Sequence, residues 1–281
     1  MTLATLVVVG CLVRVEWDDA RLSPFVAAAF GGFARSPTRD SVALSYRLIS
    51  EPGQTWYSVS RNGGLIAQGL DISQLLFAVQ QDIVVSVQSL RHDLVFVHAA
   101  VLQRDGFAFV LAAPSGSGKS TLCWAMLHEG EGFRLMSDEL APIDPKSLDV
   151  LPFLLAVTLK SRPPECCPLP ASTLETSRAL YIPVAALPST PAVECSLLRA
   201  MVFVDYKPGN TGPSLTKLSV AEAASRLYPN VLNALAHESM GIDVSIRFAR
   251  SVPSYFLASA DVAETAKKVS RLLCSLSRTP F

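Results

Sequence analysis

The sequence of 281 residues predicts an α/β fold, in which a core built around a phosphate-binding loop follows a smaller N-terminal α+β domain. Two observations predict this fold class. Apolar, strand-like runs alternate with helical candidates along the chain. A glycine-rich stretch also lies between an apolar strand and a helix, which is the place of a phosphate-binding loop. We place the domain boundary near residue 90 and expect domains at residues 1–90 and 91–281.

Composition and charge exclude several classes of protein. Half of the residues are hydrophobic, 17% are charged and the formal net charge is zero, which indicates a folded chain with a sizeable core. Because an electrostatic nucleic-acid binder needs excess positive charge, we expect no nucleic-acid partner. The apolar N-terminus reaches Arg14 and Glu16 too soon for a membrane span, so we expect a strand there and no membrane partner. The high apolar content leaves a homo-oligomer open.

The six cysteines indicate the compartment of the protein. They show neither C-x-x-C pairs nor the Cys/His spacing of a zinc site. Cysteines without such a framework are typical of a reduced protein. We therefore expect a cytoplasmic location.

Residues 1 to about 90 carry no recognisable chemical motif. Strand-like runs occupy Leu6–Trp17, Val42–Ile49 and Trp56–Ser60, and helical candidates cover about Arg21–Phe33 and Ser73–Leu90. This mixture predicts an α+β unit. Its lack of motifs favours a domain that binds a partner or an acceptor.

From residue 94 onward the pattern changes to that of a larger sheet. The apolar runs "LVFVHAAVL" and "GFAFVLAA" are joined by "QRDG", which is a hairpin turn signal. A helix is expected over about Lys119–His128, followed by the strand "FRLMS" that ends before Asp138. The proline-rich region 163–191 predicts loops.

The last third of the chain predicts two strand and helix pairs. The strand "LRAMVFVDY" precedes a helix in which Ser219 can cap the N-terminus and Glu222 stands three residues later. The strand "SVPSYFLAS" precedes a helix over about Asp261–Ser275. Alternating strands and helices of this kind are typical of an α/β core.

The stretch "APSGSGKS", residues 113–120, is the central motif. It matches the pattern G-x-x-x-x-G-K-[ST], with Ala113 in place of the first glycine. Gly116 and Gly118 supply the backbone freedom that turns N–H groups toward phosphate oxygens. We expect Lys119 to contact the β- and γ-phosphates of ATP and Ser120 to bind Mg²⁺. The predicted nucleotide-binding residues of this stretch are Ser115, Gly116, Ser117, Gly118, Lys119, Ser120 and Thr121.

Two adjacent carboxylates, Asp138 and Glu139, end the strand that follows the loop and one short helix. A right-handed crossover would make this strand the immediate parallel neighbour of the strand before the loop. Adjacent side chains at a strand end point in opposite directions. One carboxylate can therefore bind Mg²⁺ while the other orients and deprotonates an acceptor hydroxyl, which is the task of a kinase.

His98 lies near the centre of an apolar run, where a lone histidine is usually a hydrogen-bonded core residue. The hairpin, however, brings its strand alongside the strand that ends in the loop at Ala113. The imidazole could then hydrogen-bond a carboxylate or the γ-phosphate. Both interpretations are open from the residues alone.

The order "HAAV", "GFAFVLAAPSGSGKSTLCWAML" and "EGFRLMSDEL" resembles the HPr kinase/phosphorylase family, with the greatest similarity to the HPr-related kinase A branch. The similarity extends through "LPFLLAVTLKSRP", "MVFVDYKPG" and "LSVAEAASRLYPNVLN", from about Leu94 to Leu273, and more weakly into the N-terminal part. The resemblance implies a core like that of PEP carboxykinase. It also implies that His98 is the active-site histidine.

The resemblance places further roles on the acidic pair and on a later lysine. Glu139 stands where the family has the aspartate that accepts the proton, and Asp138 matches the aspartate before it. Because glutamate is longer by one methylene, either Asp138 or Glu139 can be the base. Asp138 and Ser120 are the expected metal ligands. Lys160 suits binding of ATP phosphates or of an anionic acceptor, or it is a solvated lysine at a strand end.

The sequence thus predicts an ATP-dependent serine kinase that uses Mg²⁺ and phosphorylates a protein or peptide hydroxyl. By resemblance, the acceptor could be a small PqqD-like protein or a precursor peptide. Two alternatives are open. The chain could be a nucleotide-dependent binding module or switch without phosphoryl transfer, or it could phosphorylate a small metabolite.

Overall fold

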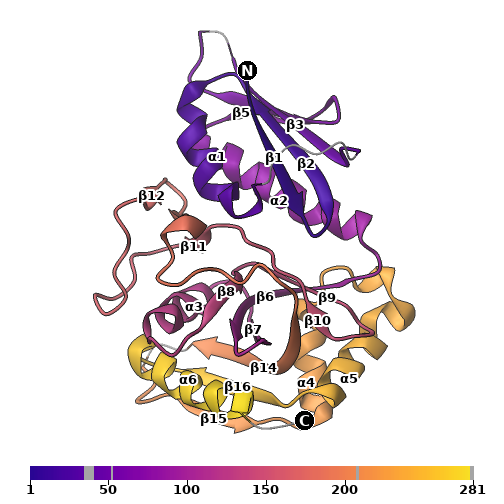
Figure 1. Ribbon diagram of the computed structural model, residues 1–281, viewed down its shortest axis with the longest axis vertical. Coiled ribbons are helices and arrows are strands. Elements are labelled where there is room, and N and C mark those ends of the chain that lie inside the picture. The colour runs from indigo at the N-terminus through magenta and orange to yellow at the C-terminus, as the bar shows by residue number, and fades with distance from the viewer. Residues whose placement is uncertain (35–40, 52, 207–208, 279–281) are drawn as a thin grey trace.

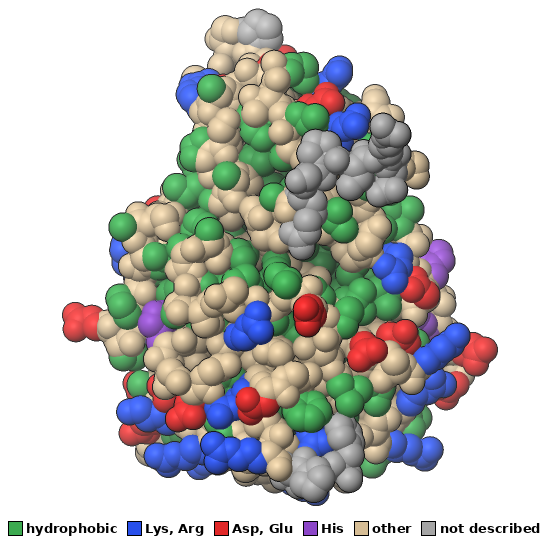
Figure 2. Space-filling model, in the orientation of Figure 1, with side chains coloured by type: hydrophobic (Ala, Val, Ile, Leu, Met, Phe, Trp, Pro, Cys, Tyr) green, Lys and Arg blue, Asp and Glu red, His purple; other side chains and the backbone are tan. Residues whose placement is uncertain are grey.

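The computed structural model describes residues 1–34, 41–51, 53–206 and 209–278. In these residues the chain is a mixed α/β protein with three sheets, and Figure 1 shows the N-terminal sheet stacked at one end of the larger sheet. Lys207 and Pro208, within the stretch "DYKPGN" at 205–210, lie outside the described residues. Figure 2 shows that charged side chains gather over the larger sheet on this face, while fewer charged and many hydrophobic side chains are seen toward the N-terminal end.

The first sheet has five strands in the order β1-β2-β3-β4-β5. Their bounds are Thr2–Val8, Cys11–Trp17, Leu44–Ser50, Tyr57–Arg61 and Gly64–Leu70. Strands β2 and β3 run parallel, and the other neighbours are antiparallel. The single strand expected over residues 6–17 is wrong, because Val9 and Gly10 turn with positive φ of 44° and 82° and fold the run into the β1–β2 hairpin.

Two helices accompany the first sheet. Helix α1 (Ser23–Phe30) is shorter than expected, because 3₁₀ turns at Ala20–Leu22 and Gly31–Phe33 flank it. Helix α2 (Ile72–Leu90) matches the expected helix and begins at a capping box formed by Asp71 and Gln74. Helix α2 packs against β4 and β5 with an apolar face.

Residues of the first sheet, α1 and α2 share one continuous apolar core with one face of the second sheet. The backbone N–H of Ala156 donates to the carbonyl of Ala29 at 3.1 Å. Gly32 approaches the same segment so closely that a Cβ there would meet the carbonyl oxygen of Leu154 at 2.3 Å. A glycine is therefore required where the N-terminal part contacts the rest of the chain.

The second sheet has eight strands, of which seven follow the order β10-β9-β6-β7-β14-β16-β15 and β8 pairs with β6. Their bounds, in chain order from β6, are Val95–Arg104, Phe107–Ala112, Arg134–Ser137, Leu140–Ile143, Asp149–Val150, Ser196–Tyr206, Ser214–Lys217 and Ser254–Ser259, with β11 to β13 belonging elsewhere. The hairpin predicted at residues 103–106 is confirmed, since β6 and β7 pair antiparallel across it. The strands expected over residues 198–206 and 251–259 are present as β14 and the shorter β16.

The expected position of the strand after the loop is wrong. Strand β8 is not the immediate neighbour of β7, because β6 lies between them and pairs antiparallel with both. Strands β7 and β8 still run in the same direction. Because β6 occupies the position next to β7 where β8 was expected, the carboxylates after β8 are separated from the loop by one strand.

Helices cover both faces of the second sheet. Alternate side chains of β6 and β7 face α3 (Lys119–His128) and α6 (Val262–Arg278) on one side, and α4 (Val220–Leu227) and α5 (Ile242–Ser251) on the other. Helix α3 is apolar around most of its circumference because α6, β6 and β11 all pack against it. The capping box predicted for Ser219 and Glu222 is present at the start of α4.

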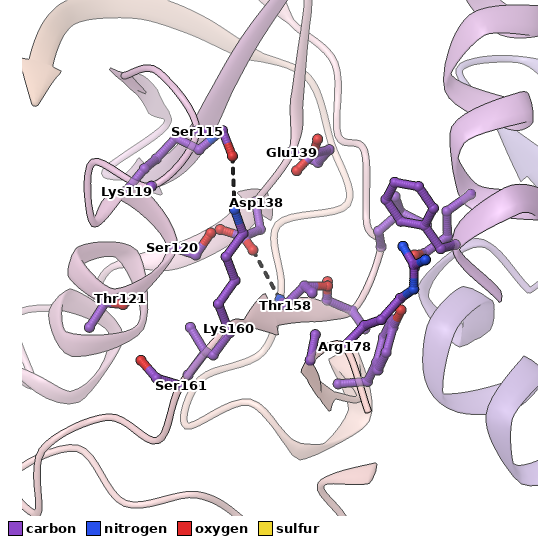
Figure 3. A pocket seen from close by; sticks show the side chains of 18 of the residues that line it. Ser115, Lys119, Ser120, Thr121, Asp138, Glu139, Thr158, Lys160, Ser161 and Arg178 are labelled. Atoms are coloured by element: carbon purple, nitrogen blue, oxygen red, sulfur yellow. Dashed lines mark hydrogen bonds between the residues drawn. The ribbon is translucent and has the colours of Figure 1, made fainter. Parts of the chain in front are cut away.

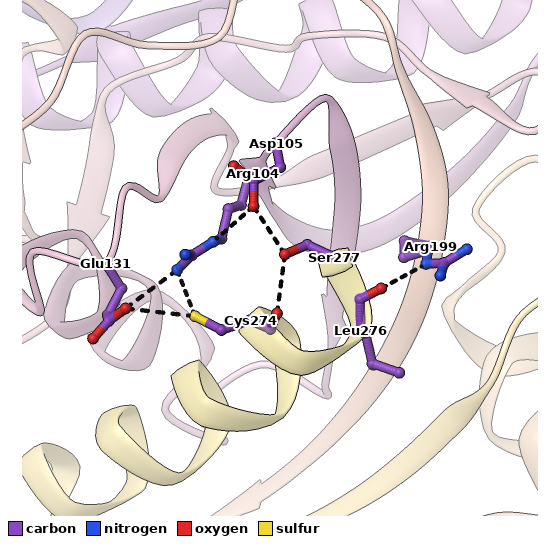
Figure 4. A network of polar contacts seen from close by, with 7 residues as sticks. All are labelled: Arg104, Asp105, Glu131, Arg199, Cys274, Leu276 and Ser277. Atoms are coloured by element: carbon purple, nitrogen blue, oxygen red, sulfur yellow. Dashed lines mark hydrogen bonds and ion pairs between the residues drawn. The ribbon is translucent and has the colours of Figure 1, made fainter. Parts of the chain in front are cut away.

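The C-terminal part of α6 is fastened to the β6–β7 hairpin by polar contacts (Figure 4). Arg104 contacts Asp105, Glu131 and the Cys274 thiol, and the Ser277 hydroxyl donates to Asp105 at 2.9 Å. Arg199 on β14 donates to the Leu276 carbonyl at 2.9 Å. These contacts fix α6 over α3 and thereby support the helix that follows the glycine-rich loop.

A small third sheet crosses above α3. It joins β11 (Val157–Leu159), β12 (Leu174–Glu175) and β13 (Leu180–Ile182) in the order β11-β13-β12. The proline-rich region 163–191 thus contains two short strands, where the sequence predicted loops. Further 3₁₀ turns lie at Val184–Ala186, Tyr228–Asn230, Ala234–Ala236 and Glu238–Gly241.

Within the described part of the chain, no helix is long and apolar enough to cross a membrane. The apolar N-terminal run is extended, as expected, but forms the two strands β1 and β2. All six cysteines are described, and none of them forms a disulfide.

Candidate functional site

The glycine-rich stretch forms a turn between a buried strand and a buried helix. Strand β7 ends at Ala112, and α3 begins at Lys119. Gly116 and Gly118 have positive φ of 89° and 79°, the conformation that favours glycine. Ala113 is absent from the residues with positive φ, so its methyl group is tolerated. The strand, loop and helix therefore take the arrangement that the motif predicts.

This loop lines a cavity of about 580 Å³. Of the eleven residues singled out from the sequence, ten line it, and Ser117 does not. The ten are His98, Ser115, Gly116, Gly118, Lys119, Ser120, Thr121, Asp138, Glu139 and Lys160. The backbone N–H of Ser117 instead donates to the Pro114 carbonyl at 3.2 Å within the loop. Figure 3 shows the labelled members of this set facing the same space.

Lys119 is held at the floor of the cavity, where it is only 7% exposed. Its Nζ lies 3.0 Å from Nε2 of His98. Because an ammonium only donates, Nε2 accepts, and the ring proton is on Nδ1. That nitrogen faces Oε1 of Glu139 at 3.6 Å. Lysine, imidazole and carboxylate thus form a chain along one wall.

Burial and neighbouring charges set the protonation of this chain. Burial lowers the pKa of Lys119, while the carboxylates of Glu139 and Asp138 act in the opposite direction. Burial and the adjacent Lys119 cation lower the pKa of His98, so the imidazole is neutral at pH 7. A neutral His98 can accept the hydrogen bond from Lys119, which agrees with the tautomer that the contact assigns.

Asp138 is buried, and its two carboxylate oxygens have different surroundings. Oδ2 accepts from the backbone N–H of Thr158 at 3.0 Å, whereas Oδ1 is buried without a hydrogen-bond partner. Burial raises the pKa of Asp138 to about 7, although Lys119, the Thr158 amide and the Ser120 hydroxyl act against this rise. An orphaned carboxylate oxygen beside a hydroxyl is a hard-oxygen donor set that suits Mg²⁺. Ser120 and Asp138 therefore fit the metal that the motif implies.

Glu139 differs from Asp138 in direction and exposure. The Ser137 hydroxyl accepts from the backbone N–H groups of Glu139 at 3.3 Å and Leu140 at 3.0 Å, which bends the chain between β8 and β9. Asp138 consequently points inward, and the Glu139 side chain remains 40% exposed. The predicted divergence of the two adjacent carboxylates is thus present, with Glu139 on the open side.

Lys160 follows β11 and lines the cavity beside the loop. Its Nζ donates to Oγ of Ser115 at 2.9 Å, as Figure 3 shows. Although Lys160 is exposed, it is not simply a solvated lysine at a strand end. The contact places a cation against the loop, where phosphate oxygens are expected to lie.

Several further residues that line the cavity were not predicted from the sequence. They come from α2 and from the third sheet and its flanking turns, and include Phe77, Gln80, Gln81, Thr158, Arg178 and Tyr181. No local motif marks them, because α2 reaches the cavity only through the packing of the N-terminal part on the core. The one signal was the similarity of the stretch around Lys160, which runs through β11.

Comparison with known proteins gives a distant structural match. No protein-family model matches the sequence, and no curated protein matches it. Among solved structures, the HPr(Ser) kinase/phosphatase from Coxiella burnetii aligns with 12% identity and a TM-score of 0.36, covering 64% of this chain and 88% of that one. A likeness at this level carries no argument about fold or activity.

Proposed function

We propose that this chain is an ATP-dependent kinase that transfers the γ-phosphate to a hydroxyl group, with a serine of a protein or peptide as the acceptor. The observation that carries the proposal is the meeting of two groups of residues in one cavity. The loop and the start of α3 bring Lys119 and Ser120, and the β8–β9 bend brings Asp138 and Glu139. A phosphate cradle beside diverging carboxylates is what phosphoryl transfer to a hydroxyl requires.

In this proposal the loop residues bind the nucleotide. Backbone N–H groups around Gly116 and Gly118 surround phosphate oxygens, and the N-terminus of α3 adds partial positive charge. Lys119 exchanges its contact with His98 for a contact with the β- and γ-phosphates. Lys160 stands above the loop and neutralises charge on the same phosphates.

Ser120 and the free Oδ1 of Asp138 are the proposed ligands of Mg²⁺. When bound there, the metal ion would offset the negative charge of the nucleotide phosphates. The hydrogen bond from the Thr158 amide holds the other oxygen of Asp138 in place. A carboxylate fixed in this way keeps one oxygen directed into the cavity.

Glu139 is the proposed base, because it is the carboxylate on the open side. It accepts the proton of the acceptor hydroxyl while the hydroxyl oxygen bonds to the γ-phosphorus. The bond from that phosphorus to the bridging oxygen breaks, and ADP leaves. His98, which faces Glu139 through Nδ1, orients the carboxylate.

Incubation with γ-labelled ATP, Mg²⁺ and serine peptides tests the proposal. We expect an acid-stable phosphoserine ester that disappears in the double variant Asp138→Asn with Glu139→Gln. In Lys119→Met we expect transfer to fall by about 10²- to 10³-fold. Lys146→Met, at an exposed lysine away from the cavity, should transfer normally.

Two outcomes separate the proposal from its alternatives. Tight ATP binding without turnover under any acceptor would favour a nucleotide-dependent switch. Transfer to a small hydroxy compound but to no peptide would favour a metabolite kinase. Transfer that survives in the double variant would remove the catalytic assignment itself.

A further inference from the structure

The cavity has a second wall that the proposed chemistry does not use. Helix α2 contributes Phe77, Gln80 and Gln81, and the turn before β13 contributes Arg178. The phosphate loop and the carboxylates form the opposite wall, and in Figure 3 Arg178 lies across the view from Lys119. A residue on the second wall can therefore contact an acceptor without contacting the phosphates of ATP.

Arg178 is held by a contact with α2 and by its own backbone turn. Its guanidinium carbon lies 5.2 Å from the centre of the Phe77 ring, within the range of a cation–π contact. The Thr176 hydroxyl accepts from the backbone N–H of Arg178 at 3.3 Å and donates to the Ala179 carbonyl at 2.9 Å. The Ser73 hydroxyl on α2 in turn donates to Thr176 at 3.4 Å. The arginine is thus positioned both by its backbone turn and by its side-chain face.

No carboxylate in the described ranges forms an ion pair with Arg178. Glu175, three residues earlier, is already paired with Arg162 at 2.7 Å. Stacking on Phe77 occupies one face of the guanidinium and leaves its N–H edge for another group. A guanidinium held in this way matches a carboxylate in a bidentate arrangement.

The other cations that line the cavity have different partners. Lys119 is directed at His98, and Lys160 is directed at Ser115 of the loop, so both serve the phosphate side. Among the described residues that line the cavity, Arg178 is the lysine or arginine that comes from neither the loop nor the end of β11. We therefore expect the negatively charged group that binds Arg178 to belong to the acceptor and not to ATP.

We propose that Arg178, stacked on Phe77, determines specificity by binding a carboxylate that the acceptor carries near its hydroxyl. The inference rests on the proposed kinase function and names the chemical class of its acceptor. On a peptide this carboxylate is an acidic side chain close to the serine. On a small acceptor it belongs to a hydroxy acid.

Equilibrium binding tests the inference separately from transfer. Full-length protein is loaded with Mg²⁺ and a non-hydrolysable ATP analogue, and fluorescein-labelled serine peptides are compared with glutamate or with glutamine at each position flanking the serine. We expect the best glutamate peptide to bind about tenfold more tightly than its glutamine twin, the size of one lost charge-assisted pair. Arg178→Gln should remove this preference and leave the affinity for the ATP analogue unchanged.

Three further variants sharpen the result. Phe77→Leu should reduce the preference only in part, because the arginine stays but loses its stacking partner. Arg178→Glu should reverse the preference toward peptides with lysine beside the serine. Arg250→Gln, at an exposed arginine outside the cavity lining, should bind like the wild type.

A small-molecule arm identifies the source of the carboxylate. Glycerate and glycerol are compared as competitors of the bound peptide and as ligands by calorimetry. If glycerate binds, glycerol does not, and Arg178→Gln loses the binding of glycerate, the inference is supported with a hydroxy acid as acceptor. The inference is overturned if glutamate and glutamine peptides bind equally and glycerate binds no better than glycerol, or if a preference for the charged ligand survives in Arg178→Gln. Labelled ATP is then added to the preferred acceptor, and binding without transfer would count against the kinase function but not against this subsite.

Discussion

The two walls of the cavity were built in different ways. The phosphate wall is assembled mainly by short stretches of chain, since residues 113–121 and 138–139 bring most of its polar groups, and His98 and Lys160 are added from β6 and from the end of β11. The opposite wall is assembled over a long sequence distance, because Phe77 on α2 meets Arg178 about a hundred residues later. The first wall can therefore be recognised from a local motif, whereas the second exists only once the N-terminal part has packed on the core.

The difference between the walls suggests a division of labour. Groups that bind a common nucleotide can be encoded locally, because the phosphate geometry is always the same. Groups that select an acceptor come in part from α2, in the part of the chain without a motif. We therefore propose that residues 1–90 contribute to acceptor selection together with Arg178, and that the rest of residues 91–281 contributes nucleotide binding and transfer.

The largest effect is expected from Glu139→Gln on the phosphate wall. The variant keeps the size and exposure of the side chain but cannot accept the proton of the acceptor. We expect kcat to fall by about 10²-fold or more, with ATP affinity unchanged. Single-turnover transfer at saturating ATP measures this, with the exposed Glu165→Gln as matched control. A normal kcat would leave Asp138 as the base.

The second wall is tested by Asp82→Asn on α2. Asp82 accepts from Tyr46 Oη at 2.6 Å and from Arg61 Nη1 at 2.9 Å, which ties α2 to the first sheet. We expect the free energy of unfolding to fall by about 1–3 kcal/mol. Acceptor affinity should fall at the same time, while ATP affinity stays within about twofold of the wild type.

Chemical denaturation and parallel titrations with ATP and acceptor measure the effect of Asp82→Asn. The control is Asp93→Asn, since Asp93 pairs with Arg91 at the surface and the loss should stay below about 1 kcal/mol. If Asp82→Asn weakens ATP and acceptor binding to the same degree, the two walls are not separable.

A smaller effect, confined to the N-terminal part, depends on pH. Asp19 caps the turn before α1, and the hydrogen bonds from Arg21 and Tyr57 lower its pKa to about 2. Because the folded pKa lies below the unfolded value of about 3.9, the stabilisation is complete above pH 5 and is lost as the pH falls toward 2. Asn at this position still caps a helix but carries no charge.

Denaturation of the wild type and of Asp19→Asn at pH 6 and at pH 3 measures this contribution. The wild type should be the more stable protein at pH 6, and the difference should shrink at pH 3. A difference that is independent of pH would contradict the assignment.

The sequence was informative where one segment decides the structure. The loop at residues 113–120, the β6–β7 hairpin and the capping box at Ser219 each depend on a few neighbouring residues, and all are present. The order of strands was not predictable in this way. Nothing in "FRLMS" shows that β6, which comes earlier in the chain, lies between β7 and β8.

The same physical limit explains the missed site residues. The packing that brings α2 to the cavity depends on contacts such as Gly32 against Leu154, which couple residues far apart in the chain. Likewise, Val9 and Gly10 make a hairpin because both adopt positive φ, and the valine gave no sign of a turn. The divergence of Asp138 and Glu139 was predictable, but the burial that distinguishes them required the third sheet above α3.

The central claim is that the loop, Ser120 and Asp138 together bind ATP with Mg²⁺, and calorimetric titration of ATP with and without the metal tests it most directly. We predict that Mg²⁺ raises the ATP affinity of the wild type by about tenfold or more and that Asp138→Asn and Ser120→Ala lose this gain. ATP affinity without the metal should change little in either variant. An undiminished gain in both variants, or a wild type that binds no ATP, would contradict the claim.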